Sequence, residues 1–187
     1  MSIRSFIAIE LSDEIKNGLS EPILSLGKSG ADIKWVVPAN LHITLKFLGN
    51  IKEDQIEDIS TIISRISADH MDFDFSITGT GTFPEGKRPR IIWAGIKDHE
   101  KIHGVYRDIE AELEIMGFKP ENRPFRPHIT IGRVRSQRGI DNLMEELVKY
   151  RHMDFGKQTA EEIHLMKSIL KPGGAEYNKI FSAQLRR

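Results

Sequence analysis

The sequence predicts an α+β protein of two similar lobes, built from antiparallel sheets with helices packed on the outside. Strand-like segments come in pairs joined by short turns, which favours antiparallel pairing over a Rossmann-type sheet. Amphipathic helical segments separate these pairs. A third observation is a repeat, because His-Ile-Thr followed by an apolar residue occurs at 42–45 and again at 128–131. The repeat indicates a duplicated α+β unit, hence two lobes about a pseudo-two-fold axis.

The first half of the chain alternates between strand and helix. Residues 3–10 form an apolar run typical of a buried strand, and 11–30 follow as a helix that Ser12 or Asp13 can cap. Further strands are expected at 33–36, 40–48 and 72–83. The segment 52–70 between the last two is a helix, because isoleucines recur on one of its faces.

The second half repeats this order. We expect strands at 88–96, 128–134, 161–170 and 176–185, and helices at 98–117 and 141–151. Each strand assignment rests on apolar residues with β-branched or aromatic side chains, and each helix on an apolar stripe. The sequences PEGKRP at 84–89 and KPGGA at 171–175 supply turns.

Composition is that of an ordinary water-soluble globular chain. Its 187 residues include 39% hydrophobic and 29% charged residues and no cysteine, which excludes disulfides and thiolate chemistry. The apolar run at the N-terminus, Phe6 to Ile9, is far too short for a signal peptide or a membrane span. We therefore expect a single bilobal domain over 1–187, cytoplasmic, monomeric and without membrane contact.

Each repeat offers an imidazole and a hydroxyl on one face of a strand. Because alternate residues of a strand point to the same side, His42 lies beside Thr44 and His128 beside Thr130, while the intervening apolar residues face the core. Two histidines can supply one general base and one general acid in a single step. Phosphodiester hydrolysis needs such a pair, and hydroxyls can bond the phosphate oxygens where charge develops. Neither a metal nor a cofactor is required.

Charge is distributed unevenly, although the formal net charge is zero. A globally basic nucleic-acid-binding protein is therefore not indicated. Five arginines bracket the second repeat: Arg123, Arg126, Arg133, Arg135 and Arg138. Their grouping around a repeated His-Thr unit favours an anion-binding site.

The sequence resembles the two-histidine (2H) phosphoesterases, in particular the bacterial and archaeal RNA 2′,3′-cyclic phosphodiesterases once called 2′-5′ RNA ligases. The segments that carry the resemblance are RSFIAIEL, KWVVPANLHITLKFLG, RPRIIWAGI, RPFRPHITIGRV and LMKSILKPGGAEY, in the order found in that family. The resemblance implies a bilobal fold with a V-shaped cleft between two antiparallel sheets. It also implies opening of a terminal 2′,3′-cyclic phosphate on RNA or a nucleotide to a 2′-phosphate, with reverse 2′-5′ ligation also allowed.

The same resemblance implies individual roles. His42 would be the general acid and His128 the general base, with Thr44 and Thr130 holding the phosphate. Phe47 and Arg133, each five residues after its histidine, would be a base-stacking aromatic and a phosphate-binding cation. Strict alternation puts both on the core face instead, so either the strands bulge there or these roles do not carry over; for Phe47, core packing is an equal alternative. Arg126 is a further candidate for substrate binding.

Two other functions are alternatives. A non-catalytic module that binds RNA ends or nucleotides would bind them through the arginines between Arg123 and Arg138, in a salt-sensitive manner and without turnover. The sequence HEKIH at 99–103 matches the zincin pattern, in which His99 and His103 would bind zinc beside Glu100. No third ligand follows at a usual spacing, and the pattern occurs once, so the zinc peptidase is the weakest of the three hypotheses.

Overall fold

The computed structural model describes residues 2–86, 88–172 and 174–187. Its strands are β1 (Ser2–Glu10), β2 (Ile33–Trp35), β3 (His42–Lys52), β4 (Phe73–Phe83), β5 (Ile91–Lys97), β6 (His128–Val134), β7 (Asp154–Ala160), β8 (Glu162–Lys171) and β9 (Gly174–Gln184). Its helices are α1 (Asp13–Gly27), α2 (Gln55–Asp69), α3 (Glu100–Ile115), α4 (Ile140–Val148) and a short 3₁₀ helix η1 (Pro38–Asn40). The α+β class is confirmed.

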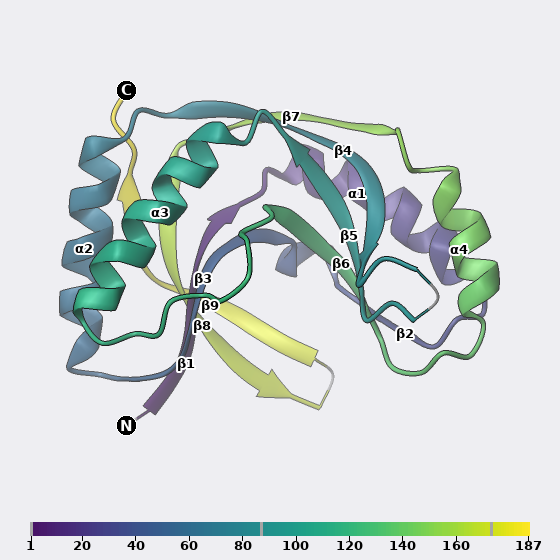
Figure 1. The fold of residues 1–187 in the computed structure, drawn as a ribbon, viewed down its shortest axis with the longest axis horizontal. Coiled ribbons are helices and arrows are strands. Elements are labelled where there is room, and N and C mark those ends of the chain that lie inside the picture. The colour runs from purple at the N-terminus through teal and green to yellow at the C-terminus, as the bar shows by residue number, and fades with distance from the viewer. Residues whose placement is uncertain (1, 87, 173) are drawn as a thin grey trace.

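One curled sheet replaces the two sheets that the sequence predicted. Within the described ranges the strands follow the order β7-β4-β5-β6-β3-β1-β8-β9, with β2 also paired to β6, and all of these pairs are antiparallel (Figure 1). The two halves meet where Ile43 of β3 pairs with Ile129 of β6. Both isoleucines are fully buried, so the motif strands share one core and cover each other's edges. The pseudo-two-fold duplication stays a prediction.

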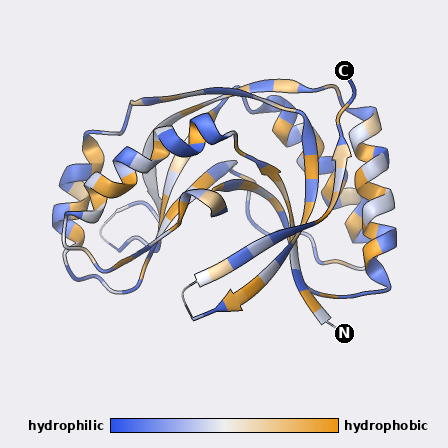
Figure 2. Ribbon diagram, turned by 180° about the vertical axis from the view of Figure 1, so that it is seen from behind, coloured by the Kyte–Doolittle hydropathy of each residue, from blue (hydrophilic) through white to orange (hydrophobic). Residues whose placement is uncertain are grey.

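Helices cover the convex side of each half. Figure 1 shows α2 and α3 together at one end of the molecule and α1 and α4 at the other, in agreement with their contacts. Orange and blue alternate along the helices in Figure 2, as expected for elements with one buried face. Helix α1 begins as predicted, because the Ser12 hydroxyl accepts a hydrogen bond from the Ile15 N–H at 3.3 Å. The described helices include none long and apolar enough to span a membrane.

Strand β7 was not predicted. Its sequence DFGKQTA has only Phe155 and Ala160 buried, and a glycine interrupts the alternation. The strand forms because it pairs with β4, from Phe73 opposite Ala160 to Thr78 opposite Asp154. The turns expected at 84–89 and 171–175 contain Lys87 and Gly173, which lie outside the described residues.

Both motif strands contain a bulge just after the threonine. In β3, Ile7 and Ala8 of β1 pair with Lys46 and Thr44, so Leu45 is an extra residue. In β6, Ile131 is extra at the same place relative to the motif, between the partners of two consecutive residues of β5. Each bulge reverses the alternation for the residues that follow it.

Candidate active site

The register of the central strands brings the two motifs together. Because Ile43 pairs with Ile129, the next residues set His42 opposite Thr130 and Thr44 opposite His128. The isoleucines point into the core, so all four polar side chains point to the opposite, concave face. The structure therefore places the predicted imidazoles and hydroxyls on one small area of sheet.

Both imidazoles are held by the same kind of hydrogen bond. His42 Nδ1 lies 2.7 Å from the Asn40 carbonyl oxygen, and His128 Nδ1 lies 2.7 Å from that of Arg126. A carbonyl oxygen only accepts, so Nδ1 carries a hydrogen in each ring and Nε2 is the nitrogen available for proton transfer. His42 Nε2 lies 3.0 Å from the Thr44 hydroxyl. Within the described residues, no protein group hydrogen-bonds His128 Nε2.

The surroundings lower the pKa of both histidines. Burial is the largest cause for His42, where the charges of Arg133 and His128 act in the same direction and the Asn40 carbonyl opposes them. Burial also lowers the pKa of His128, again reinforced by Arg133 and opposed by the Arg126 carbonyl. The Arg133 guanidinium is thus within electrostatic range of both rings. At neutral pH both imidazoles of the free protein are mainly uncharged.

Because of the bulges, Arg133 and Phe47 do not lie on the face that strict alternation predicts for them. Arg133 is exposed, on the same side as the histidines, while Ile131 and Gly132 before it are both buried. Phe47 is 57% exposed and follows the buried pair Leu45 and Lys46 in the same way. Both side chains therefore lie on the open face, and the expectation from strict alternation is wrong.

Aromatic rings that the sequence did not single out form the walls around the histidines. His42 lies 4.8 Å from Phe6 and 5.3 Å from Tyr177, measured between ring centroids, and Tyr177 meets it edge-on. Phe83 meets His128 edge-on at 5.0 Å. These contacts join strands far apart in sequence, so no local pattern reveals them; Phe6 was expected only as part of a buried strand.

Asn40 connects the first histidine to the β8–β9 hairpin. Its side-chain amide donates to the Ala175 carbonyl at 2.7 Å, while its own carbonyl accepts the His42 Nδ1 hydrogen. Tyr177 on the same hairpin contacts the His42 ring. The hairpin and the imidazole are therefore held in register through one residue.

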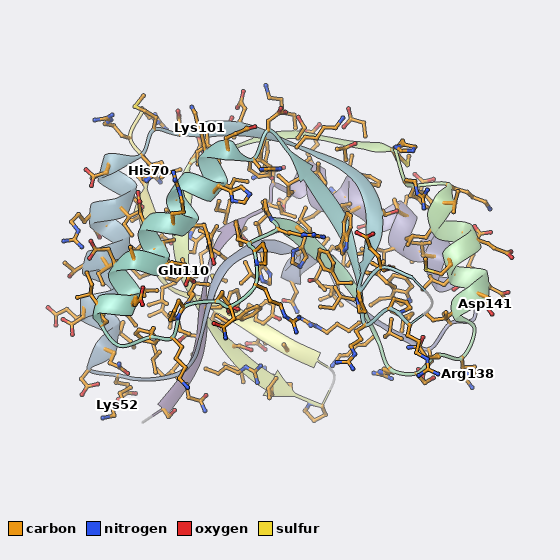
Figure 3. The ribbon with its side chains drawn as sticks, viewed as in Figure 1. Lys52, His70, Lys101, Glu110, Arg138 and Asp141 are labelled. Carbon is orange, nitrogen blue, oxygen red and sulfur yellow. The ribbon has the colours of Figure 1, made fainter. Side chains whose placement is uncertain are left out.

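The five arginines do not form one surface. Arg126 turns its guanidinium toward Glu85, 3.9 Å away, although its carbonyl holds His128. Arg138 lies at the outer end of the molecule beside Asp141 and α4, far from the central strands (Figure 3). Arg133 is the member of the five whose charge acts on both histidines, and it is therefore the strongest candidate for the predicted anion site, which stays a prediction.

A hollow of about 730 Å³ opens beside Phe47, between β3 and the segment 117–123 that follows α3. A buried ion pair fixes that segment, because Lys46 lies 2.6 Å from Glu110 and donates to the Lys119 carbonyl at 2.7 Å. Figure 3 labels Glu110 on α3. The lining of the hollow contains neither histidine. Phe47, which lines it, lies 6.2 Å from Phe6 between ring centroids, and Phe6 in turn contacts His42.

A protein-family model described as LigT like Phosphoesterase matches residues 9–93 and 96–177. The chain belongs to the LigT-like phosphoesterase family. It is 33% identical to an RNA 2′,3′-cyclic phosphodiesterase of Methanothermobacter thermautotrophicus over 95% of this chain and 96% of that protein. It is 34% identical to an RNA 2′,3′-cyclic phosphodiesterase of Methanocaldococcus jannaschii, over 95% of this chain and 98% of that protein. The resemblance found in the sequence is thus confirmed.

Solved structures share the fold of this chain. The crystal structure of TT0787 of Thermus thermophilus superposes with a TM-score of 0.83 at 26% identity, over 98% of both chains. That of E. coli LigT complexed with 3′-AMP gives 0.80 at 22% identity, over 100% of both chains. The curled sheet is therefore a feature of known proteins of this shape.

The zincin-like sequence of this LigT-like phosphoesterase lies at the start of α3. The rings of His99 and His103 are 4.9 Å apart, and Glu100 begins the helix. No group of three metal-binding side chains occurs in the part of the chain that the structure describes. His103 instead packs edge-on against Phe125 at 5.3 Å, and Phe125 stacks on Tyr106 at 3.9 Å. These contacts hold the segment that leads to His128.

Proposed function

We propose that this protein hydrolyses the terminal 2′,3′-cyclic phosphate of RNA to a 2′-phosphate, using its two histidines as acid and base without a metal. The observation that carries the proposal is the matched pair of imidazoles, each with Nδ1 bonded to a backbone carbonyl two residues earlier, which leaves Nε2 as the nitrogen for proton transfer. His42 Nε2 faces the Thr44 hydroxyl. The names of its full-length relatives support the choice of substrate.

In the proposed reaction His128 Nε2 takes a proton from water as the water oxygen attacks phosphorus. The bond between phosphorus and O3′ breaks, and His42, protonated on both nitrogens, gives its Nε2 proton to O3′. The products are a 2′-phosphate and a 3′-hydroxyl. Each ring exchanges a proton at Nε2 alone, so neither has to turn or break its bond to the backbone. This allocation of acid and base follows the family.

The remaining side chains act on the phosphate and the base. Thr44 and Thr130 donate hydrogen bonds to the non-bridging oxygens, and the Arg133 charge offsets the negative charge that grows there. Phe47, exposed beside the hollow, offers a surface for a nucleobase. Binding of the anion also raises the pKa of His42, which charges the acid when substrate is present. Attack by the 5′-hydroxyl of another RNA end in place of water would follow the same route, with cleavage of the phosphorus–O3′ bond, and form a 2′-5′ bond.

The test uses an oligoribonucleotide ending in a 2′,3′-cyclic phosphate, with products followed by phosphorus NMR in excess EDTA. We expect a 2′-phosphate in EDTA, and His42→Ala and His128→Ala should each lower the rate by about 10²–10⁴-fold. His152→Ala is the matched control, because His152 is exposed and outside the motifs.

Full activity in either motif variant, or loss of activity on chelation, contradicts the proposal. Tight binding of the oligonucleotide without turnover would instead favour a binding module for RNA ends.

A further inference from the structure

Two cations lie side by side on the concave face without a negative partner. Lys34 of β2 is directly opposite Arg133 of β6, so both side chains leave the sheet on the same side. Both are exposed, and neither makes an ion pair with any described residue. Like charges placed directly across a strand pair destabilise a sheet, so this arrangement indicates a bound anion.

Packing on the other face fixes the direction of Lys34. Trp35, the next residue, is partly buried against the core, and a Cβ on Gly132 would lie 3.0 Å from its Cε3. Since neighbours in a strand alternate, Lys34 points away from the core. Strand β2 runs along the same edge of β6 as β3, farther from the histidines, and Val36 continues it with a hydrogen bond to the Ile131 carbonyl at 3.0 Å.

The lysine also reaches toward the opposite wall. A Cβ built on Gly174 would lie 4.0 Å from Lys34 Cε, and Gly174 begins β9 at the end of the β8–β9 hairpin. Figure 1 shows this hairpin projecting from the sheet on the side of β2. Tyr177 of the same hairpin contacts His42. An anion between Lys34 and Arg133 would therefore sit next to, and distinct from, a phosphate gripped by the two histidines.

We propose that Lys34 and Arg133 together bind the internucleotide phosphate that precedes the terminal nucleotide. This inference rests on the proposed function and specifies its substrate, an RNA end of at least two nucleotides rather than a free nucleoside cyclic phosphate. Arg133 serves both anions, since a guanidinium presents five N–H donors in a fixed fork. Lys34 contacts only the internucleotide phosphate. Variants of Lys34 therefore distinguish binding of the internucleotide phosphate from binding of the reacting cyclic phosphate.

The experiment compares kcat/KM for a dinucleotide ending in a 2′,3′-cyclic phosphate with that for a nucleoside 2′,3′-cyclic phosphate. The wild type should prefer the dinucleotide by on the order of tenfold. Lys34→Gln should remove this preference and leave the mononucleotide rate within about twofold, while Lys34→Arg keeps it. Lys52→Gln is the control, an exposed lysine at the outer end of β3 (Figure 3). The slope of log Kd against log salt for the dinucleotide should fall by about 0.7 in Lys34→Gln.

Three results would overturn the inference: no wild-type preference, no effect of Lys34→Gln, or an equal loss on both substrates. An equal loss on both substrates would mean that Lys34 acts on the reacting phosphate or on folding. Thermal unfolding distinguishes these two explanations. If folding is intact, Lys34→Gln removes one of two like charges and should leave Tm unchanged or higher. If the wild type cleaves neither substrate, the proposed function fails by itself. The subsite is then judged by calorimetric affinity for the two ligands, where Lys34→Gln must weaken only the dinucleotide.

Discussion

The proposed catalysis depends on the environment of two imidazole nitrogens, Nε2 of His42 and Nε2 of His128. Each imidazole gives its Nδ1 hydrogen to a carbonyl two residues earlier, in Asn40 and Arg126. The repeated His-x-Thr spacing made the histidines predictable from sequence, since polar residues two apart share a face. The acceptors were not predictable, because every residue type carries a backbone carbonyl. The effect of the Arg133 charge on the pKa of both histidines was not predictable either, because the direction of its side chain depends on a bulge.

The pH dependence of kcat/KM follows from the lowered pKa of both histidines. The base must be neutral, so the rate rises as pH passes its pKa; the acid must be protonated, so the rate falls above its pKa. Burial and the Arg133 charge lower the pKa of both histidines. The rising and the falling part of the pH–rate profile therefore both move to lower pH. We expect an optimum on the acid side of about pH 6.5.

Arg133→Gln tests the electrostatic part of this argument. Removing the positive charge should raise both pKa values, so the optimum moves to higher pH even though the rate falls. The control is Arg138→Gln, at the far end of the molecule (Figure 3). An optimum that stays in place in Arg133→Gln would show that the arginine does not act on the histidines.

At the scale of secondary structure, the periodic segments were predictable and their exceptions were not. Helix α2 follows from its isoleucine stripe, and β6 was predicted with the bounds that the structure has. Strand β7 has little periodicity of its own and depends on β4. The bulges at Leu45 and Ile131 likewise arise from pairing with β1 and β5, so alternation counted along one strand misplaced the residues after them.

The hairpin contact of Asn40 gives a prediction at this scale. Asn40→Ala removes the bond to the Ala175 carbonyl, worth about 1 kcal/mol, and frees both the hairpin and the carbonyl that orients His42. We expect kcat to fall by about three- to tenfold, with a smaller change in KM. Steady-state kinetics on the dinucleotide substrate measures both. Asn178→Ala, an exposed position on the same hairpin, should change neither; equal effects of the two variants would remove the special role of Asn40.

For the whole molecule, the decisive feature is the seam between the halves of the sheet. The sequence indicated two lobes because it contains two copies of the motif, and local patterns predicted which strands form. They could not show that the copies pair with each other, since that contact joins residues 86 positions apart. The seam joins the strands of both halves of the chain into one continuous sheet, and it sets each histidine opposite the threonine of the other motif.

The seam should therefore couple stability to catalysis. Ile129→Ala leaves a cavity between the motif strands and should lower the free energy of unfolding by about 2–5 kcal/mol. It should also lower kcat at temperatures where the protein stays folded, because the cavity lies between the two strands that carry the histidines. Ile77→Ala, at an equally buried position on β4, should cost similar stability without the loss of kcat. Urea titration and kinetics on the same samples separate the two effects, and unchanged kcat in Ile129→Ala would contradict the coupling.

The inserted residue after each threonine limits how this motif can be transplanted. In a regular β-strand without a bulge, the sequence His-Ile-Thr-Ile-Gly-Arg would place the imidazole and the hydroxyl on one face of the sheet. The arginine side chain would then point to the opposite face. A designer who copies the motif must also copy the neighbouring strand against which it bulges. Conversely, a single-residue deletion of Leu45 or Ile131 would remove the extra residue and restore regular alternation, with Phe47 or Arg133 still on the face of the histidines.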